Sequence, residues 1–297
     1  MKTLSLRLVV CFICLTACAL AQVAPQPNDH VPIYTVTVVQ RALQAVNFQR
    51  HSGPTDIDLK GTVLLPKAEG HATVEAKNGY TKIDFNLKKL DPPTIFGLEF
   101  LTYVLWAITP DGKAVNLGEV IPNGALKANM SVTSPYSTFG LLITAEPYFS
   151  VPYPSDVIVV ESAVRPDTIG RVEEVEAKAE LLPRGQYTLN IRASQLASAN
   201  MKNQPSVSME QYEATTELYQ ARNAIQIARA DGAAQAAAGT LAKASSYLDQ
   251  AEAAYLKKNY KGMIDTARQA VEAASDARMI AMRQKKEAGR INSFEPN

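Results

Sequence analysis

The chain has 297 residues, of which 20% are charged, and a formal net charge of +1 at pH 7. This balance gives no whole-chain attraction to nucleic acid or to an anionic membrane surface, so we expect no nucleic-acid partner. All three cysteines (Cys11, Cys14 and Cys18) lie near the N-terminus, which leaves the rest of the chain without a disulfide or a thiol nucleophile.

The first residues are typical of an export signal. Lys2 and Arg7 provide positive charge, and Leu8–Leu15 is an apolar run that is too short to span a bilayer. We therefore predict a signal peptide over 1–21, followed by a Pro- and Asn-containing tether over 22–30. The expected location is the periplasm or the outer membrane.

Two processing sites compete in this signal. Leu15-Thr16-Ala17-Cys18 matches the lipobox of bacterial lipoproteins, in which the cysteine is acylated and becomes the new N-terminus. Ala19-Leu20-Ala21 is a site for ordinary signal peptidase, which would cleave before Gln22. Cys18 is thus a candidate lipid-attachment residue, and a lipid on it is the expected means of membrane attachment.

Residues 31–193 carry the signals of short strands joined by tight turns. Asn78-Gly79 tolerates the positive φ of a type I′ hairpin, and Pro110-Asp111-Gly112 is a second turn signal. Alternation and β-branched content predict strands at Ile33–Val39, Ala72–Ala76, Tyr80–Leu87, Tyr103–Ile108, Ala114–Val120, Leu141–Thr144 and Val157–Val160. The pattern predicts an all-β sandwich domain, with Trp106 and Phe139 in its core.

The composition then shifts to an Ala-rich region. A polar stretch at 194–206 is the predicted linker, 207–288 the predicted helical domain, and 289–297 a flexible tail. We predict an all-α antiparallel helical bundle or hairpin stack in this region.

Capping and breaking residues divide the helical region into three helices. Ser208 and Gln211 have the spacing of a capping box at the start of the first helix. Asp231-Gly232 and Asn259–Gly262 interrupt the apolar stripes that recur at spacings of three and four. We expect these stripes to form intramolecular core rather than a groove for a partner helix.

The search for catalytic constellations is negative. The sequence contains no G-x-S-x-G, H-E-x-x-H, P-loop or G-x-G-x-x-G motif. His30, His51 and His71 lie singly in expected loops or strand edges, and Glu146 is expected to be a turn residue. We therefore predict no catalytic, metal-binding or cofactor-binding residues.

Aromatic residues concentrate in one proline-rich segment of the β domain. Tyr148, Phe149 and Tyr153 lie among Pro147, Pro152 and Pro154 in an expected loop. Rigid aromatic side chains in a loop are suited to contact a peptide, a glycan or the edge of a protein. These three aromatics are the candidate ligand or partner contacts.

The middle of the β domain also resembles a known group of proteins. Leu101–Gly112 (LTYVLWAITPDG), Ala114–Glu119 (AVNLGE) and Phe139–Phe149 (FGLLITAEPYF) are similar to a segment of Gram-negative envelope proteins. Pro154–Val157 and Arg165–Thr168 continue the likeness. In those proteins a β domain precedes a helical region and often an outer-membrane-protein-A-like peptidoglycan-binding domain. The resemblance implies an envelope location.

Two fainter resemblances accompany this one. The Tyr-x-Leu-Trp, Asp-Gly, Leu-Gly and Glu-Pro landmarks are similar to the extracytoplasmic domain of anti-sigma-K factors. Leu218–Arg278 resembles an Ala-rich helical domain of envelope lipoproteins and, loosely, tetratricopeptide hairpins. The sequence ends at Asn297 without residues that match the peptidoglycan-binding domain, so the resemblance does not imply peptidoglycan binding.

Taken together, these features predict a non-catalytic, exported binding or scaffold protein of the cell envelope, with an envelope protein or a cell-wall component as its partner. A second hypothesis is a periplasmic carbohydrate- or peptide-binding module that uses the aromatics near Tyr148. A third is a hydrolase whose site is assembled only by the fold. The sequence leaves open the oligomeric state and whether the helices pack on the β domain.

Overall fold

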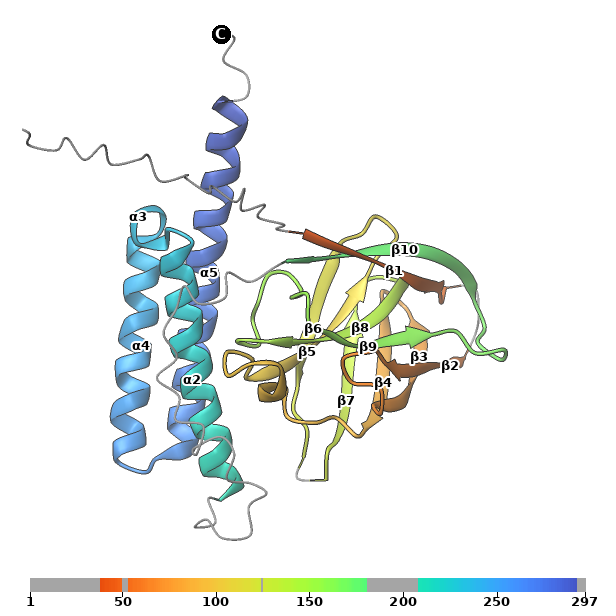
Figure 1. Cartoon of the computed structure of the whole chain (residues 1–297), viewed down its shortest axis with the longest axis horizontal. Coiled ribbons are helices and arrows are strands. Elements are labelled where there is room, and N and C mark those ends of the chain that lie inside the picture. Colours follow the sequence, from red (N-terminus) through yellow and green to blue (C-terminus); the bar gives the residue numbers. More distant parts are fainter. Residues whose placement is uncertain (1–37, 50–52, 124, 181–207, 293–297) are drawn as a thin grey trace, which may run out of the picture. The chain divides into compact units, whose positions relative to one another are not determined.

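The strands of the β domain form one antiparallel sheet in the computed structural model, which describes residues 38–49, 53–123, 125–180 and 208–292 (Figure 1). In chain order the strands are β1 (Val38–Asn47), β2 (Pro54–Gly61), β3 (Glu69–Lys77), β4 (Tyr80–Lys88), β5 (Thr102–Ile108), β6 (Ala114–Val120), β7 (Lys127–Ser134), β8 (Thr138–Glu146), β9 (Ile158–Ala163) and β10 (Arg171–Glu180). A short 3-10 helix, η1 (Pro93–Phe96), precedes β5. All described residues belong to one compact unit.

The sheet is continuous and nearly closed into a barrel. Its strand order is β7-β4-β3-β2-β9-β8-β5-β6, and the antiparallel pair of β1 and β10 joins it through the start of β8. Because β8 pairs with β9 on one side and β5 on the other, the two halves remain one sheet. The prediction of a β domain followed by helices is therefore confirmed, whereas the prediction of a two-sheet sandwich is wrong.

The inside of the barrel holds one apolar core. Tyr103 and Leu105 point into it from β5, and the ring of Phe139 lies 5.0 Å from that of Phe48. The hydroxyl of Tyr103 donates a hydrogen bond to the carbonyl of Asp91 at 2.7 Å, which satisfies its polar end inside the core. Phe139 thus fills the β-domain core as predicted.

The outer faces of β5 and β8 belong to a second core, which they share with the helices. Val104, Trp106 and Ile108 alternate with the inward residues of β5. With Leu142 of β8 they belong to a cluster that contains helical side chains and also Leu43, Ala45, Val175 and Ala177 of the β1–β10 pair. The indole N–H of Trp106 donates to Thr144 Oγ1 at 2.8 Å. Trp106 therefore lies in this second core and not in the core inside the barrel.

Most of the strands that the sequence predicts are present. Five predicted ranges coincide with or lie inside β3, β4, β5, β6 and β8, and the sixth, Val157–Val160, overlaps β9. Gly79 has a φ of 87° in the turn between β3 and β4, as the hairpin signal requires. Strands β2, β7 and β10 were not among the predicted ranges.

The helices are α2 (Met209–Ala230), the short α3 (Ala233–Ala236), α4 (Ala238–Leu256) and α5 (Tyr260–Asn292). Helix α2 begins and ends where the capping signals place it, whereas α5 begins at Tyr260, inside the predicted break at Asn259–Gly262. The backbone N–H of Gln211 donates to Ser208 Oγ at 3.1 Å, and Gly232 takes a left-handed φ of 92° after α2. No helix in the described part of the chain is both long and apolar enough to cross a membrane.

The long helices lie side by side. Arg222 on α2 contacts Glu252 on α4 at 2.7 Å, and Arg229 contacts Ser245 at 3.3 Å, so these two helices run in opposite directions. Buried alanines of all three long helices, Ala251 among them, share the second core with β5 and β8. The apolar stripes therefore form intramolecular core, and the helices pack on the β domain.

Several predictions concern residues outside the described ranges. These are the signal peptide over 1–21 with Cys18, the tether over 22–30, His30 and His51, the linker over 194–206, and most of the strand at Ile33–Val39. Helix α5 continues to Asn292, beyond the predicted end of the helical domain at 288.

Replacing Trp106 tests the second core. We expect Trp106→Ala to lower the free energy of unfolding by about 3–5 kcal/mol, since it removes the largest buried side chain between sheet and helices. Urea unfolding followed by far-UV circular dichroism measures this change. The control is Leu256→Ala, which removes a side chain that is 83% exposed and should change stability by less than about 0.5 kcal/mol. Equal effects of the two substitutions would contradict the assignment.

Candidate functional site

The proline-rich loop after β8 is held by the helices at the junction with the β domain. The backbone N–H of Phe149 donates to Gln220 Oε1 on α2 at 2.7 Å, and Asn223 Nδ2 donates to the carbonyl of Pro147 at 3.3 Å. On α5, the hydroxyl of Ser275 donates to the carbonyl of Ser150. The loop therefore contacts helices of its own chain.

The three predicted contact aromatics have different surroundings in this loop. Tyr148 is fully buried, and Arg278 Nη1 lies 3.3 Å from its hydroxyl. Phe149 is half-buried beneath Arg268, whose guanidinium carbon is 3.8 Å from the ring centroid. Tyr153 is 46% exposed. A ligand in solution reaches Tyr153 directly, but it reaches Tyr148 only if the helices move away.

A buried carboxyl group lies behind the loop. Glu146, expected to be a turn residue, ends β8 and is fully buried. Its Oε1 accepts hydrogen bonds from the Thr144 hydroxyl and, at 2.7 Å, from the Ser155 backbone N–H. Burial raises the pKa of Glu146 to about 8, although these donors and the charge of Arg278 oppose the rise. The protonated form is therefore favoured at neutral pH.

Two further carboxylates meet at the junction of β6, α2 and α5. Glu119 on β6 and Glu217 on α2 both bind Nη1 of Arg268, Glu119 through Oε2 at 2.6 Å. The side chain of Glu119 is 6% exposed and that of Glu217 is 2% exposed. A bulge at Asn116–Gly118, where Gly118 has a φ of 128°, re-aims the end of β6 toward the helices.

The two carboxylates have unequal sets of donors. Glu119 Oε1 also accepts hydrogen bonds from the Thr102 hydroxyl at 2.7 Å and from Gln220 Nε2 at 2.8 Å. Among the described residues, Glu217 accepts a hydrogen bond only from Arg268, and its Oε2 has no hydrogen-bond partner. Burial, and then the nearby charge of Glu119, raise the pKa of Glu217 to about 8, against the opposing effect of Arg268.

A pocket of about 130 Å³ opens beside this pair. Glu119, Glu217 and Gln220 form its polar wall, together with the more exposed Glu213 on α2. The other walls are largely apolar and include Pro92, Pro93, Leu101, Ile121, Pro122 and Leu126. A concave apolar site with a few convergent polar groups is the usual form of a small-ligand site. This pocket is the candidate functional site.

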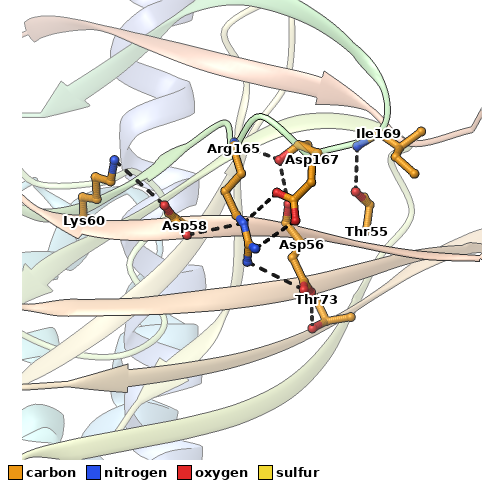
Figure 2. A network of polar contacts seen from close by, with 9 residues as sticks. Thr55, Asp56, Asp58, Lys60, Thr73, Arg165, Asp167 and Ile169 are labelled. Carbon is orange, nitrogen blue, oxygen red and sulfur yellow. Dashed lines mark hydrogen bonds and ion pairs between the residues drawn. The ribbon is translucent and has the colours of Figure 1, made fainter.

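A second polar network lies between β2 and the β9–β10 connection. Figure 2 shows Arg165 pointing toward Asp56, Asp58 and Asp167. Arg165 forms a two-pronged pair with Asp167, with both N–O distances at 2.9 Å, and longer contacts with Asp56 and Asp58 at 3.7 and 3.9 Å. The charged side chains of this network pair with one another at the surface, so the network attaches the β9–β10 connection to β2.

An open hollow of about 440 Å³ adjoins this network and includes His71. Charges of both signs line it, among them Lys60 and Asp58, which lie 3.9 Å apart, and Glu69 and Lys88. In the part of the chain that the structure describes, no group of His, Cys, Asp and Glu side chains is arranged to hold a metal ion. His71 is exposed on β3, and we assign it no site.

The sequence analysis did not identify the polar groups of the pocket. Glu217, Gln220 and Asn223 are spaced by three along α2, which places them on one helix face beside the apolar stripe, and the first two line the pocket. This polar stripe between apolar residues was the available signal. No sequence signal links it to Glu119, about a hundred residues earlier on β6.

Comparisons of the chain with family models, with curated proteins and with solved structures found no match. The candidate site therefore rests on the geometry of the chain itself.

Glu146 gives the stability of the junction a pH dependence. The folded-state pKa of about 8 lies above the ordinary pKa of 4.5 for a glutamate, so stabilisation by the neutral group is complete below pH 4.5 and is lost as the pH rises to 8. Between pH 5.5 and 7.5 we expect this group to lower the free energy of unfolding by about 1.4 kcal/mol per pH unit.

Urea unfolding of Glu146→Gln over this pH range measures the contribution. The neutral isostere should remove that part of the slope, whereas Glu272→Gln, at an exposed position on α5, should keep it. A slope that is the same in both variants would show that Glu146 does not hold a proton in the folded protein.

Arg268 is expected to be essential for the junction because two buried carboxylates depend on it. Arg268→Met should lower the free energy of unfolding by about 3–5 kcal/mol, since it leaves the buried charge of Glu119 without a cation. The matched control, Arg222→Met, breaks a half-exposed pair with Glu252 and should cost less than about 1 kcal/mol. Denaturation at pH 7 compares the two variants, and equal losses would contradict the burial of the Arg268 pairs.

Proposed function

We propose that the chain is a non-catalytic binding and scaffold protein that is exported to the cell envelope. The observation that carries this proposal is the pocket at the junction, where the sheet, α2 and α5 together present buried charge inside an apolar rim. Because the sheet and the helices both contribute to this site, the site can bind a ligand and also hold the sheet and the helices in one arrangement. In this proposal the helices α2, α4 and α5 act as one bundle that supports the pocket.

The arrangement of the carboxylates favours binding over catalysis. Glu119 and Glu217 share one guanidinium nitrogen of Arg268, which holds both side chains in place. A catalytic carboxylate needs to exchange its partner with the substrate during the reaction. A pocket of about 130 Å³ also suits one small group better than a substrate with its attacking water.

Export is the second part of the proposal, and it rests on the signal-like segment over 1–21. Either a lipid on Cys18 anchors the chain to the outer membrane, or cleavage before Gln22 releases it into the periplasm. An envelope protein or a cell-wall component is the proposed partner. The resemblance to Gram-negative envelope proteins supports the same location.

A specific observation keeps a hydrolase as a second candidate. Glu217 has a raised pKa beside another carboxylate, and such pairs also serve as general acids in enzymes. The carbohydrate- or peptide-binding hypothesis that uses the loop aromatics is less well supported, because Tyr148 is buried against Arg278. We rank both below the scaffold.

Expression in a Gram-negative host tests export. The full chain should be found in the envelope or periplasmic fraction, with an intact mass that begins at an acylated Cys18 or at Gln22. A variant without residues 1–21 should stay in the cytoplasm, and Cys18→Ser should change the fraction only if Cys18 carries lipid. A full chain that remains unprocessed in the cytoplasm would contradict the proposal.

Site-specific photo-crosslinking in the same cells tests binding at the pocket. A photoreactive amino acid at Ile121, which lines the pocket and is 52% exposed, should give a reproducible adduct with an envelope component. The control position is Leu256, which is 83% exposed at the end of α4 and does not line the pocket. Adducts at Leu256 and none at Ile121 would place the binding surface elsewhere.

A further inference from the structure

The pocket at the junction carries more negative than positive groups. Glu119 and Glu217 face one guanidinium, that of Arg268, and the carboxyl group of Glu213 lines the same pocket. Among the described residues that line it, none is a lysine, an arginine or a histidine. When Glu217 is ionised, the charge balance of the pocket therefore favours a cation.

One buried oxygen of Glu217, a residue that lines the pocket, also lacks a hydrogen-bond donor among the described residues. Glu217 is 2% exposed, and its Oε2 has no partner among the described residues. The neighbouring carboxylate of Glu119, by contrast, accepts bonds from three donors: Thr102, Gln220 and Arg268. A buried acceptor without a donor costs free energy, so a ligand that brings an N–H group to Glu217 gains affinity.

The volume and the walls of the pocket limit the rest of the ligand. The pocket holds about 130 Å³, somewhat less than a cavity of about 150 Å³ that accommodates benzene. Its apolar walls, such as Pro93, Leu101 and Ile121, suit a hydrocarbon chain. The fitting ligand is therefore a short apolar stem that ends in a cationic N–H donor.

We propose that this pocket binds one alkylammonium group, with its ammonium at Glu217 and its stem along the apolar wall. The inference rests on the proposed binding function and names the chemistry that the pocket takes. A lysine side chain of a peptide and a small free amine share this chemistry.

Binding then exchanges a proton at Glu217. The pKa of this carboxyl group is raised by burial and by Glu119 on β6, with a smaller contribution from Glu213, and it is opposed by Arg268 on α5. Without a bound cation, Glu217 holds its proton at neutral pH. The alkylammonium keeps its own protons and donates an N–H to the ionised carboxylate, so one proton leaves Glu217 for the solvent.

Titration calorimetry of the full chain, purified from the envelope fraction, tests the proposal with two matched pairs of probes. n-Butylammonium should bind, and n-butanol should bind at least about tenfold more weakly, because it lacks the charge that Glu217 requires. N-acetyl-lysine amide against N-acetyl-norleucine amide provides the peptide pair. Tighter binding of N-acetyl-lysine amide than of butylammonium would identify the ligand as a lysine side chain of a peptide. Tighter binding of butylammonium would identify it as a small free amine.

Two isosteric variants locate the site. Glu217→Gln should weaken butylammonium binding by about tenfold or more, whereas Glu210→Gln, the same substitution at an exposed position of α2 that does not line the pocket, should change it by less than about threefold. Circular dichroism confirms that both variants are folded. Equal binding to wild type and Glu217→Gln, or equal binding of butylammonium and butanol, would overturn the inference.

The proton exchange provides an independent readout. Butylammonium affinity should rise by about tenfold per pH unit between pH 6 and 7, and Glu217→Gln should lose this dependence. Competition by potassium at the same concentration as butylammonium would show a nonspecific cation site and overturn the proposal. If no amine binds but photo-crosslinking at Ile121 still gives its adduct, this inference alone is refuted. If photo-crosslinking at Ile121 gives no adduct, the proposed function is refuted.

Discussion

Strands β5 and β8 are apolar on both faces, and the rest of the structure depends on covering them. Their inward side chains, such as Tyr103, belong to the barrel core, and their outward side chains, such as Trp106 and Leu142, need a second apolar surface. A sheet that is buried on both faces requires a further layer, because exposed apolar area on this scale is unfavourable. The alanine-rich helices supply that layer together with Leu43, Ala45, Val175 and Ala177 of the β1–β10 pair.

Covering the sheet with helices brings polar groups into the buried junction. The same face of α2 that approaches the β domain carries Glu217, Gln220 and Asn223, whose partners are loop carbonyls and amides, Glu119 and Arg268. Satisfied buried polar contacts fix one relative position of two packed surfaces, since any shift breaks several of them. Glu217 lines the pocket and keeps one buried oxygen without a donor among the described residues, and this residue connects the packing of the junction to its proposed ligand.

Alternation and turn residues predicted much of the fold, and the reasons for the failures are physical. Asn78-Gly79 marked its hairpin because few residues tolerate the φ that the turn requires. Strand β10, rich in glutamate, was missed because its side chains suit a helix, and only pairing with β1 makes it a strand. The apolar run at Tyr103–Ile108 was attributed to two packed sheets, since sequence alone does not show whether a sheet or a helix covers a face. The pocket could not be predicted, because Glu119 and Glu217 meet only through the packing of helices on the barrel.

The central claim is that the helices and the barrel are stable only together. The protein has one tryptophan, and Trp106 lies where the two parts meet, so its fluorescence reports on their contact while far-UV circular dichroism reports on secondary structure. Equilibrium unfolding in urea, followed with both signals, tests the claim directly. Coincident transitions with one midpoint are the predicted result. A red shift of Trp106 emission at lower urea than the loss of ellipticity would show that the helices leave an intact sheet, and it would contradict the account.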